Sequence, residues 1–131
     1  MDFRGTDPDA AVEQDNAWRE RVGRLAADTK AMNERLRELR CTLHDPNRVV
    51  EVTVDSSGTL LDVHFSDRIR RVPPEDVART LMETLEEARR RMSEESAQVI
   101  GETMGEDSRA GQAVAERLRD RLVPTGPEAE R

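Results

Sequence analysis

Residues 49–65 read VVEVTVDSSGTLLDVHF, a stretch in which apolar and polar side chains alternate on both sides of Asp-Ser-Ser-Gly. Alternation with a period of two is typical of strands with one buried face, and Gly58 allows the positive φ of a tight turn. We therefore expect an antiparallel hairpin that needs a helix over its apolar face. Six side chains are expected on that face: Val50, Val52, Val54, Leu61, Val63 and Phe65.

A second turn signal, Asp-Pro-Asn at residues 45–47, precedes the hairpin. Residues 40–44 lie before this turn and are expected to form a short first strand, paired with a strand over residues 48–55. The sequence thus predicts a three-stranded antiparallel meander.

The stretch before the meander has a helical period instead. Its apolar residues are spaced alternately by four and three, with Thr29 at the one polar position. This heptad spacing predicts a long helix over residues 9–38. The seam consists of Trp18, Val22, Leu25, Met32, Leu36 and Leu39. Such a seam is either part of the core or a homodimer interface, and the sequence leaves both open.

Two further helices are expected after the meander. Pro73-Pro74-Glu75-Asp76 is typical of a helix start, and the helix is expected to end at Val99 or Ile100. Its buried stripe is expected to contain Val77, Leu81, Leu85, Ala88 and Met92. After Gly101, Gly105 and a break at GEDS, a short helix is expected over residues 109–122. Its apolar face is expected to contain Ala110, Val114, Leu118 and Leu122.

This pattern predicts an α+β fold with one main domain. Residues 1–8 are expected to be a flexible N-terminus, 9–105 the main domain, 106–123 a C-terminal helical extension and 124–131 a disordered tail. Hydrophobic residues make up 35% of the chain against 37% charged ones, so the core of one copy must be thin. We therefore expect a homodimer, in which Leu81, Leu85 and the seam supply the core and the subunit interface.

Composition excludes several classes of protein. No apolar run resembles a signal peptide or a membrane span, so a cytoplasmic location is expected. The lone Cys41 cannot form an internal disulfide, and the near absence of aromatic residues disfavours single-stranded nucleic acid. Because no phosphate-binding loop or nucleophile elbow occurs, we expect neither an enzyme nor a cofactor.

Two histidines and an aspartate are candidates for a metal or catalytic site. Asp62 and His64 share the polar face of one expected strand, and His44 could approach them across the sheet. Two imidazoles and a carboxylate are a ligand set that suits zinc. No close-spaced ligand motif accompanies them, so we expect an ordinary polar surface and no metal.

Two arginine clusters stand out against the net charge of −7. The first follows the hairpin and consists of Arg68, Arg70 and Arg71, and the second lies in the second long helix and consists of Arg89, Arg90 and Arg91. Such arginines either contact phosphates, with an affinity that falls steeply with salt, or form a solvated face paired with nearby glutamates.

The whole arrangement resembles the YbaB/EbfC family of bacterial nucleoid-associated proteins over residues 12–104. VEVTVDSSG and LLDVHFSD resemble the strand-turn-strand of that family, and the helix beginning at PPEDVARTLMETLEEARRRMSEE resembles its last helix. The resemblance implies an α-β-β-β-α protomer and a homodimer that binds duplex DNA with little sequence specificity. The acidic charge, the single lysine and the third helix depart from the family.

The leading hypothesis is a nucleoid-associated-like protein whose two arginine clusters contact DNA phosphates. The alternative is a structural or adaptor protein that binds another protein through its helical faces without touching DNA. The net charge and the third helix favour that alternative.

Overall fold

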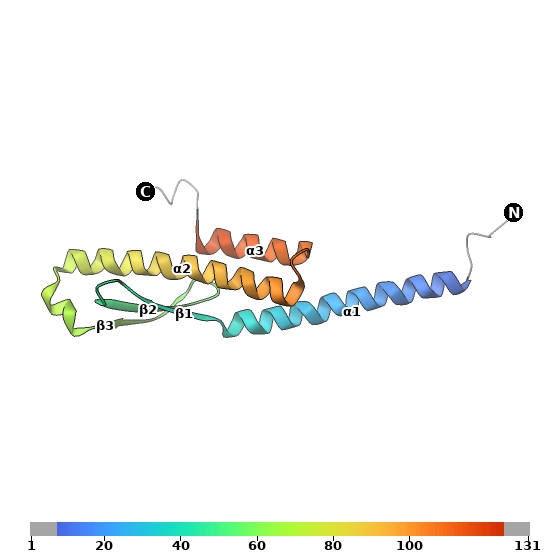
Figure 1. Ribbon diagram of the computed structural model, residues 1–131, viewed down its shortest axis with the longest axis horizontal. Coiled ribbons are helices and arrows are strands. Elements are labelled where there is room, and N and C mark those ends of the chain that lie inside the picture. The colour runs from blue at the N-terminus through green and yellow to red at the C-terminus, as the bar shows by residue number, and fades with distance from the viewer. Residues whose placement is uncertain (1–7, 125–131) are drawn as a thin grey trace.

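The computed structural model describes residues 8–124 (Figure 1). The flexible termini predicted for residues 1–8 and 124–131 lie almost wholly outside this range. The elements along the chain are helix α1 (Pro8–Glu38), strands β1 (Arg40–His44), β2 (Val50–Asp55) and β3 (Leu60–Phe65), the 3-10 helix η1 (Asp67–Arg71), and helices α2 (Pro74–Met104) and α3 (Arg109–Leu122). The predicted α+β order of long helix, three-stranded meander, long helix and short helix is confirmed.

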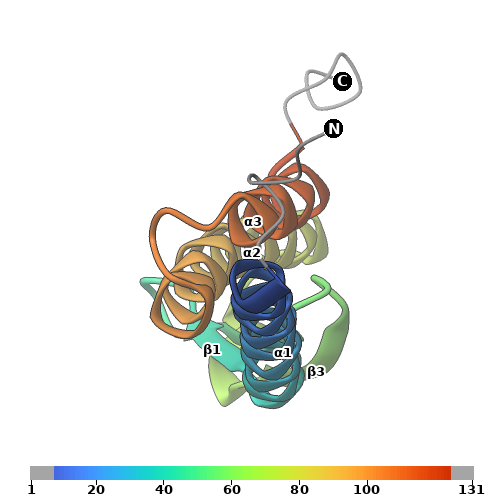
Figure 2. The same ribbon diagram turned by 90° about the vertical axis from the view of Figure 1, so that its right-hand side faces the viewer.

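The elements form layers around α2. Figures 1 and 2 show the antiparallel sheet, in the order β1-β2-β3, on one side of α2 and α3 on the other. The first half of α2 covers the sheet, and its second half runs beside the C-terminal part of α1. The N-terminal part of α1 continues beyond the rest of the molecule. α2 is therefore the central element, because it contacts the sheet, α1 and α3.

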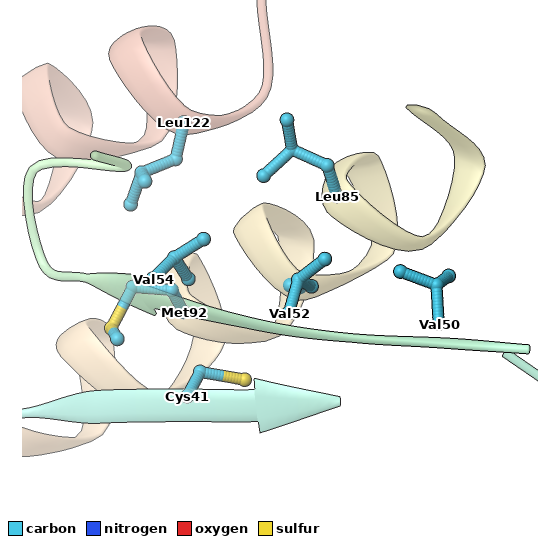
Figure 3. Packing of buried hydrophobic residues seen from close by; sticks show 8 residues of the cluster. Cys41, Val50, Val52, Val54, Leu85, Met92 and Leu122 are labelled. Carbon is cyan, nitrogen blue, oxygen red and sulfur yellow. The ribbon is translucent and has the colours of Figure 1, made fainter. Parts of the chain in front are cut away.

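One core cluster lies between the sheet and the first half of α2. Val52 and Val54 are fully buried, and Ala88 and Met92 of α2 pack against them. Figure 3 shows that Leu122, at the end of α3, belongs to the same cluster and lies on the same side of the strands as Leu85 of α2. The predicted role of the Val50–Val52–Val54 face is confirmed.

A second core cluster lies between α1, α2 and α3. Met32 and Leu36 of α1 are buried against Val99 and Ile100 of α2. Helix α3 adds the half-buried Val114, Ala115 and Leu118. The C-terminal half of the seam is thus core, whereas Trp18, Val22 and Leu25 are 57%, 46% and 47% exposed.

The sheet departs from the expected pattern in strand β3. The register pairs Val52 with Val63 but Val54 with Leu60, because a bulge interrupts the ladder beside Thr53. Leu60 therefore occupies the core position predicted for Leu61, which is 47% exposed. Phe65 is 41% exposed because β3 is the edge strand at the side that α2 covers least.

Two other expectations about boundaries and faces were wrong. Helix α2 continues to Met104, past the expected end at Val99 or Ile100, because its last turn packs against α1 and α3. In α3, Gly111 and not Ala110 is buried: a Cβ at Gly111 would lie 3.0 Å from Cβ of Met104. The glycine allows the two helices to approach closely where a larger residue would separate them.

Strand β2 begins two residues later than predicted. Arg48 has a φ of 55°, and the Asp45 carboxylate accepts hydrogen bonds from the backbone N–H groups of Val49 and Val50 at 2.7 and 2.8 Å. These N–H groups are therefore satisfied by a side chain at the point where the turn opens into the strand. Asp45 is itself buried.

Cys41 is buried in the first core cluster, and this burial raises the pKa of its thiol. Because the thiolate is the reactive form, we expect a maleimide or disulfide reagent to leave the folded protein unmodified and to modify it fully in denaturant. Mass spectrometry after a timed reaction measures this. Rapid labelling of the native protein would contradict the observed packing.

Candidate nucleic-acid interface

The first arginine cluster lies in η1, the short turn that connects β3 to α2. Ser66 caps this turn: its hydroxyl accepts a hydrogen bond from the Arg68 N–H at 3.2 Å and donates one to the Arg48 carbonyl at 2.7 Å. The turn thereby presents Arg68, Arg70 and Arg71, all exposed, at the end of the molecule opposite the projecting part of α1 (Figure 1). The structure therefore places the three predicted residues of this cluster together.

Two further arginines lie at the same end. The guanidinium of Arg68 donates to the Asn47 carbonyl at 2.9 Å, which ties η1 to the β1–β2 turn where Arg48 lies. Arg68 and Arg71 line one shallow groove with Arg79 of α2, and Arg68 lines a neighbouring groove with Arg48. We call these five residues the end cluster: Arg48, Arg68, Arg70, Arg71 and Arg79.

Sequence reasoning missed Arg48 and Arg79, because neither belongs to a run of basic residues. Arg48 follows the Asp-Pro-Asn turn and Arg79 lies in the second turn of α2, so only the packing of the turns brings them together. Arg79 pairs with Asp76, which also lines the groove and reduces the local positive charge.

The second arginine cluster is largely engaged inside the chain. Arg89 is half-buried, and its Nε donates to the Gly58 carbonyl at 2.9 Å, which ties α2 to the β2–β3 turn. Arg90 forms ion pairs with Glu87 and Glu94, which raise its pKa, while its hydrogen bond to Glu87 lowers the pKa of that carboxyl. Arg91 is exposed. The three residues therefore do not present three equivalent guanidinium groups.

The polar face of the sheet carries the candidate metal ligands His44, Asp62 and His64. Strand pairing aligns His44, Glu51 and His64 in one row across the three strands, whereas Asp62 lies in the next row beside Thr53. The His44 Nδ1 is within 2.9 Å of the Asp45 carbonyl. Within residues 8–124, no three His, Cys, Asp or Glu side chains gather in a way that could hold a metal ion.

Three of the predicted seam and core residues lie in the first core cluster. Leu85 is buried and Leu39 and Leu81 are half-buried against the first core cluster, so these three belong to the interior of one copy.

None of the helices in residues 8–124 has the length and apolarity that a membrane crossing requires.

Comparison with known protein families agrees with this architecture. The model of the YbaB/EbfC DNA-binding family matches residues 14–107, which include most of α1, the whole sheet and α2. Helix α3 begins just after the matched region. A search of curated proteins found no match. The chain belongs to the YbaB/EbfC family of DNA-binding, nucleoid-associated proteins.

Proposed function

We propose that this protein binds duplex DNA as a homodimer with little sequence specificity and acts at the nucleoid in the cytoplasm. The observation that carries the proposal is the end cluster, in which arginines from the β1–β2 turn, η1 and α2 lie on one end of the molecule. Membership of a DNA-binding family supports the same activity.

Phosphate contact is the mode of binding that the end cluster supports. A guanidinium is always charged, and its planar set of donors suits phosphate oxygens. The net charge of −7 repels DNA at long range, but salt limits this repulsion to roughly 8 Å, so that the exposed arginines act on a phosphate at close range. Phosphate contacts position a protein on a duplex without reading its bases, hence the low specificity.

The end cluster is a better candidate than the second cluster. Arg89 donates a hydrogen bond to Gly58, and Arg90 donates hydrogen bonds to Glu87 and Glu94. Contact of either guanidinium with DNA would require these interactions to break. Arg91 remains an accessible secondary contact. We therefore rest the proposal on Arg68, Arg70 and Arg71, and add Arg48 and Arg79 at their side.

The test is the affinity for a mixed-sequence duplex across a salt series. Replacing Arg68, Arg70 and Arg71 together with glutamine is expected to weaken binding at low salt at least about tenfold. It should also make the slope of log K against log salt less steep by roughly 0.9 for each lost phosphate contact. Duplexes of unrelated sequence are expected to bind with similar affinities.

A matched control is available in α3, whose exposed Arg117, Arg119 and Arg121 remove the same charge when replaced with glutamine. We expect this control to retain the wild-type salt slope. Equal effects of the two triple variants would show that net charge, and not the end cluster, determines binding. An unchanged affinity in the first variant would contradict the proposal.

One observation favours a protein partner as a second candidate function. Met82 is 55% exposed beside a groove that is also lined by Leu85, Leu122 and Val123, at the junction of α2 and α3. Capture of a protein that survives nuclease treatment and is lost in a Met82→Glu variant would support an adaptor role. Loss of the captured protein on nuclease treatment would favour DNA.

A further inference from the structure

The outer face of α2, which is turned away from the sheet, is only partly covered by α3. Figure 1 shows α3 beside the second half of α2 and ending over its middle, while the first half of α2 continues beyond it. Leu122, the last residue of α3, lines a groove together with Leu85 of α2. We call residues 74–86 of α2, which lie beyond this point, the open segment.

The open segment carries the end of an apolar stripe. Ala78, Met82 and Leu85 are spaced by four and three residues, so they lie on one face of the helix. Leu85 is 7% exposed, whereas Met82 is 55% exposed and Ala78 is also exposed. The stripe is therefore covered at Leu85 and uncovered at the two preceding positions.

A groove of about 460 Å³ lies where α3 ends on this stripe, a volume in the range of known binding pockets. Its apolar lining consists of Met82, Leu85, Leu122, Val123 and Pro124. Leu122 is anchored in the core at 2% exposure, and the Val123 N–H donates to the Arg119 carbonyl at 2.7 Å. The groove is thus largely formed before any partner binds, which lowers the entropic cost of binding.

Two free carboxylates lie on the rim of the groove. Glu83 and Glu86 both line it and are exposed. Neither side chain forms an ion pair or a hydrogen bond with another residue in the range 8–124. They are therefore available to a positively charged partner.

The basic groups of the groove are already engaged. Arg90 pairs with Glu87 and Glu94, and Arg89 donates to the Gly58 carbonyl. The C-terminal end of α3, the negative end of its helix dipole, also lies at this groove. The free charges around the apolar lining are therefore negative, which favours a basic partner and repels the phosphates of DNA.

We propose that this groove binds a basic amphipathic helix of another protein, which lies on the open segment in line with α3. Its apolar side chains, spaced by three or four residues, cover Met82 and Ala78, and its lysines or arginines pair with Glu83 and Glu86. The inference rests on the protein-partner candidate described above and specifies the chemistry of that partner. An amphipathic helix laid into an apolar groove is a common mode of peptide recognition, and a methionine adapts well to such a partner.

Continuity with the packing of α3 supports a helix as the occupant. Leu118 and Leu122 of α3, four residues apart, already pack on α2 in this way. The open segment has 13 residues and is about 20 Å long, which leaves room for three turns of a further helix. The partner would extend along α2 the same helix-on-helix layer that α3 begins.

The groove also depends on a part of the chain that the family model does not cover. Leu122, Val123 and Pro124 all follow residue 107, where the match to the DNA-binding family ends. These residues form one wall of the groove, so the surface is a feature added to the matched domain by α3.

The first test selects peptides without assuming a sequence. A phage-displayed library of random peptides of about 16 residues, long enough for four helical turns, is selected on the wild-type protein and counter-selected on Met82→Ser. We expect the enriched peptides to be basic, with apolar residues spaced by three or four. Failure to enrich any peptide over the counter-selection, or enrichment of acidic or strictly alternating sequences, would overturn the proposal.

A synthetic peptide of the selected consensus then tests the individual contacts. Met82→Ser is expected to weaken its binding at least about tenfold, because it removes the exposed apolar anchor. Replacing Glu83 and Glu86 together with glutamine is expected to weaken binding about fivefold, as two surface ion pairs are lost. Isothermal titration calorimetry measures both changes.

Matched controls lie on α1, away from the groove. Val12→Ser removes an apolar side chain that is 58% exposed, and replacing Glu13 and Glu20 with glutamine removes two exposed carboxylates. Both controls should bind the peptide as the wild type does. Equal losses in the control and groove variants would show nonspecific adhesion and overturn the assignment.

The helical form of the occupant is tested with the same peptide. Its circular dichroism should become more helical on binding, and a proline in its centre should abolish binding, because proline breaks a helix interior. Undiminished binding of the proline peptide would overturn the helical mode.

Failure of this proposal is distinguishable from failure of the functions proposed above. A protein captured from cells that binds Met82→Ser as tightly as wild type would keep the adaptor role and overturn the groove. Met82→Ser is expected to keep the wild-type affinity for duplex DNA and its salt slope, since it leaves every arginine of the end cluster in place. A DNA affinity that falls together with peptide binding would overturn the assignment of the groove to a protein helix.

Discussion

Replacing Leu122 with alanine is expected to lower the free energy of unfolding by about 3 kcal/mol, the typical cost of a cavity at a buried leucine. Leu122 is only 2% exposed and is the residue through which α3 enters the core between α2 and the sheet. Although α3 lies outside the region matched by the family, the variant should therefore destabilise the whole domain. Urea unfolding followed by circular dichroism measures the change.

The close packing of Leu122 on the hairpin turn can be tested with a second substitution, at Gly58. Gly58 has a φ of 82°, and a Cβ on it would lie 2.8 Å from Cδ2 of Leu122. Gly58→Ala is therefore expected to be destabilising both through the φ, at about 1 kcal/mol, and through the clash. In the Leu122→Ala background the clash is absent, so Gly58→Ala should cost less there than in the wild type.

Arg121→Ala is the control for both variants, because Arg121 is exposed on the same turn of α3. Arg121→Ala is expected to change the free energy of unfolding by no more than about 0.5 kcal/mol. If Leu122→Ala behaved like Arg121→Ala, α3 would be a loosely attached extension and the packing against Gly58 would be irrelevant to stability.

Local periodicity was sufficient to predict the order of the elements. The heptad spacing ends at Leu39, and the structure changes there from helix α1 to strand β1, because each period reflects the geometry of its element. The two turns were also predictable, since Asp45-Pro46-Asn47 and Asp55-Ser56-Ser57-Gly58 contain the residues that turns require. These signals are local, and the structure preserves them.

Non-local features were not predictable in the same way. The bulge that places Leu60 in the core instead of Leu61 is a property of strand pairing, whereas the alternating pattern alone selects Leu61, in step with Val63 and Phe65. The seam is one continuous pattern in the sequence, yet α2 ends beside Thr29 and divides it into buried and exposed halves. How far a neighbouring helix reaches depends on the packing of the whole domain.

In the candidate site too, the features that depend on local sequence were predictable and those that depend on the packing of distant segments were not. Arg68, Arg70 and Arg71 were recognisable because they are close together in the sequence and lie in one short turn. Arg48 and Arg79 join them only through the folding of separate turns, so no spacing rule could have identified them. In the second cluster the sequence also shows three adjacent arginines, but the positions of Gly58 and of the neighbouring glutamates give each a different role.

Asp45→Ala is expected to lower the free energy of unfolding by about 2–3 kcal/mol, because it removes the acceptor from buried backbone donors. The carboxylate accepts from the N–H groups of Asn47, Val49 and Val50, and Asp45 is only 5% exposed. Without it, the buried N–H groups of Val49 and Val50 lose the acceptor that the fold supplies. Thermal and urea unfolding measure the loss.

Asp55→Ala is the matched control, since Asp55 holds the other turn with two similar bonds to Ser57 and Thr59. These bonds are exposed, so water can replace the carboxylate and the expected cost is about 1 kcal/mol or less. Asp45→Asn should lie between the two, because its amide keeps one oxygen acceptor. Equal losses in the two alanine variants would show that burial of the Asp45 turn does not matter.

The Asp45 turn also connects stability to the proposed DNA contacts. It fixes Arg48 at its positive φ, and it holds the Asn47 carbonyl that accepts the Arg68 guanidinium. Under conditions where Asp45→Ala remains folded, its affinity for duplex DNA is therefore expected to fall several-fold, whereas that of Asp55→Ala should not change. Unchanged DNA affinity in a folded Asp45→Ala protein would indicate that Arg48 and Arg68 need no fixed turn, because flexible arginines reach phosphates equally well.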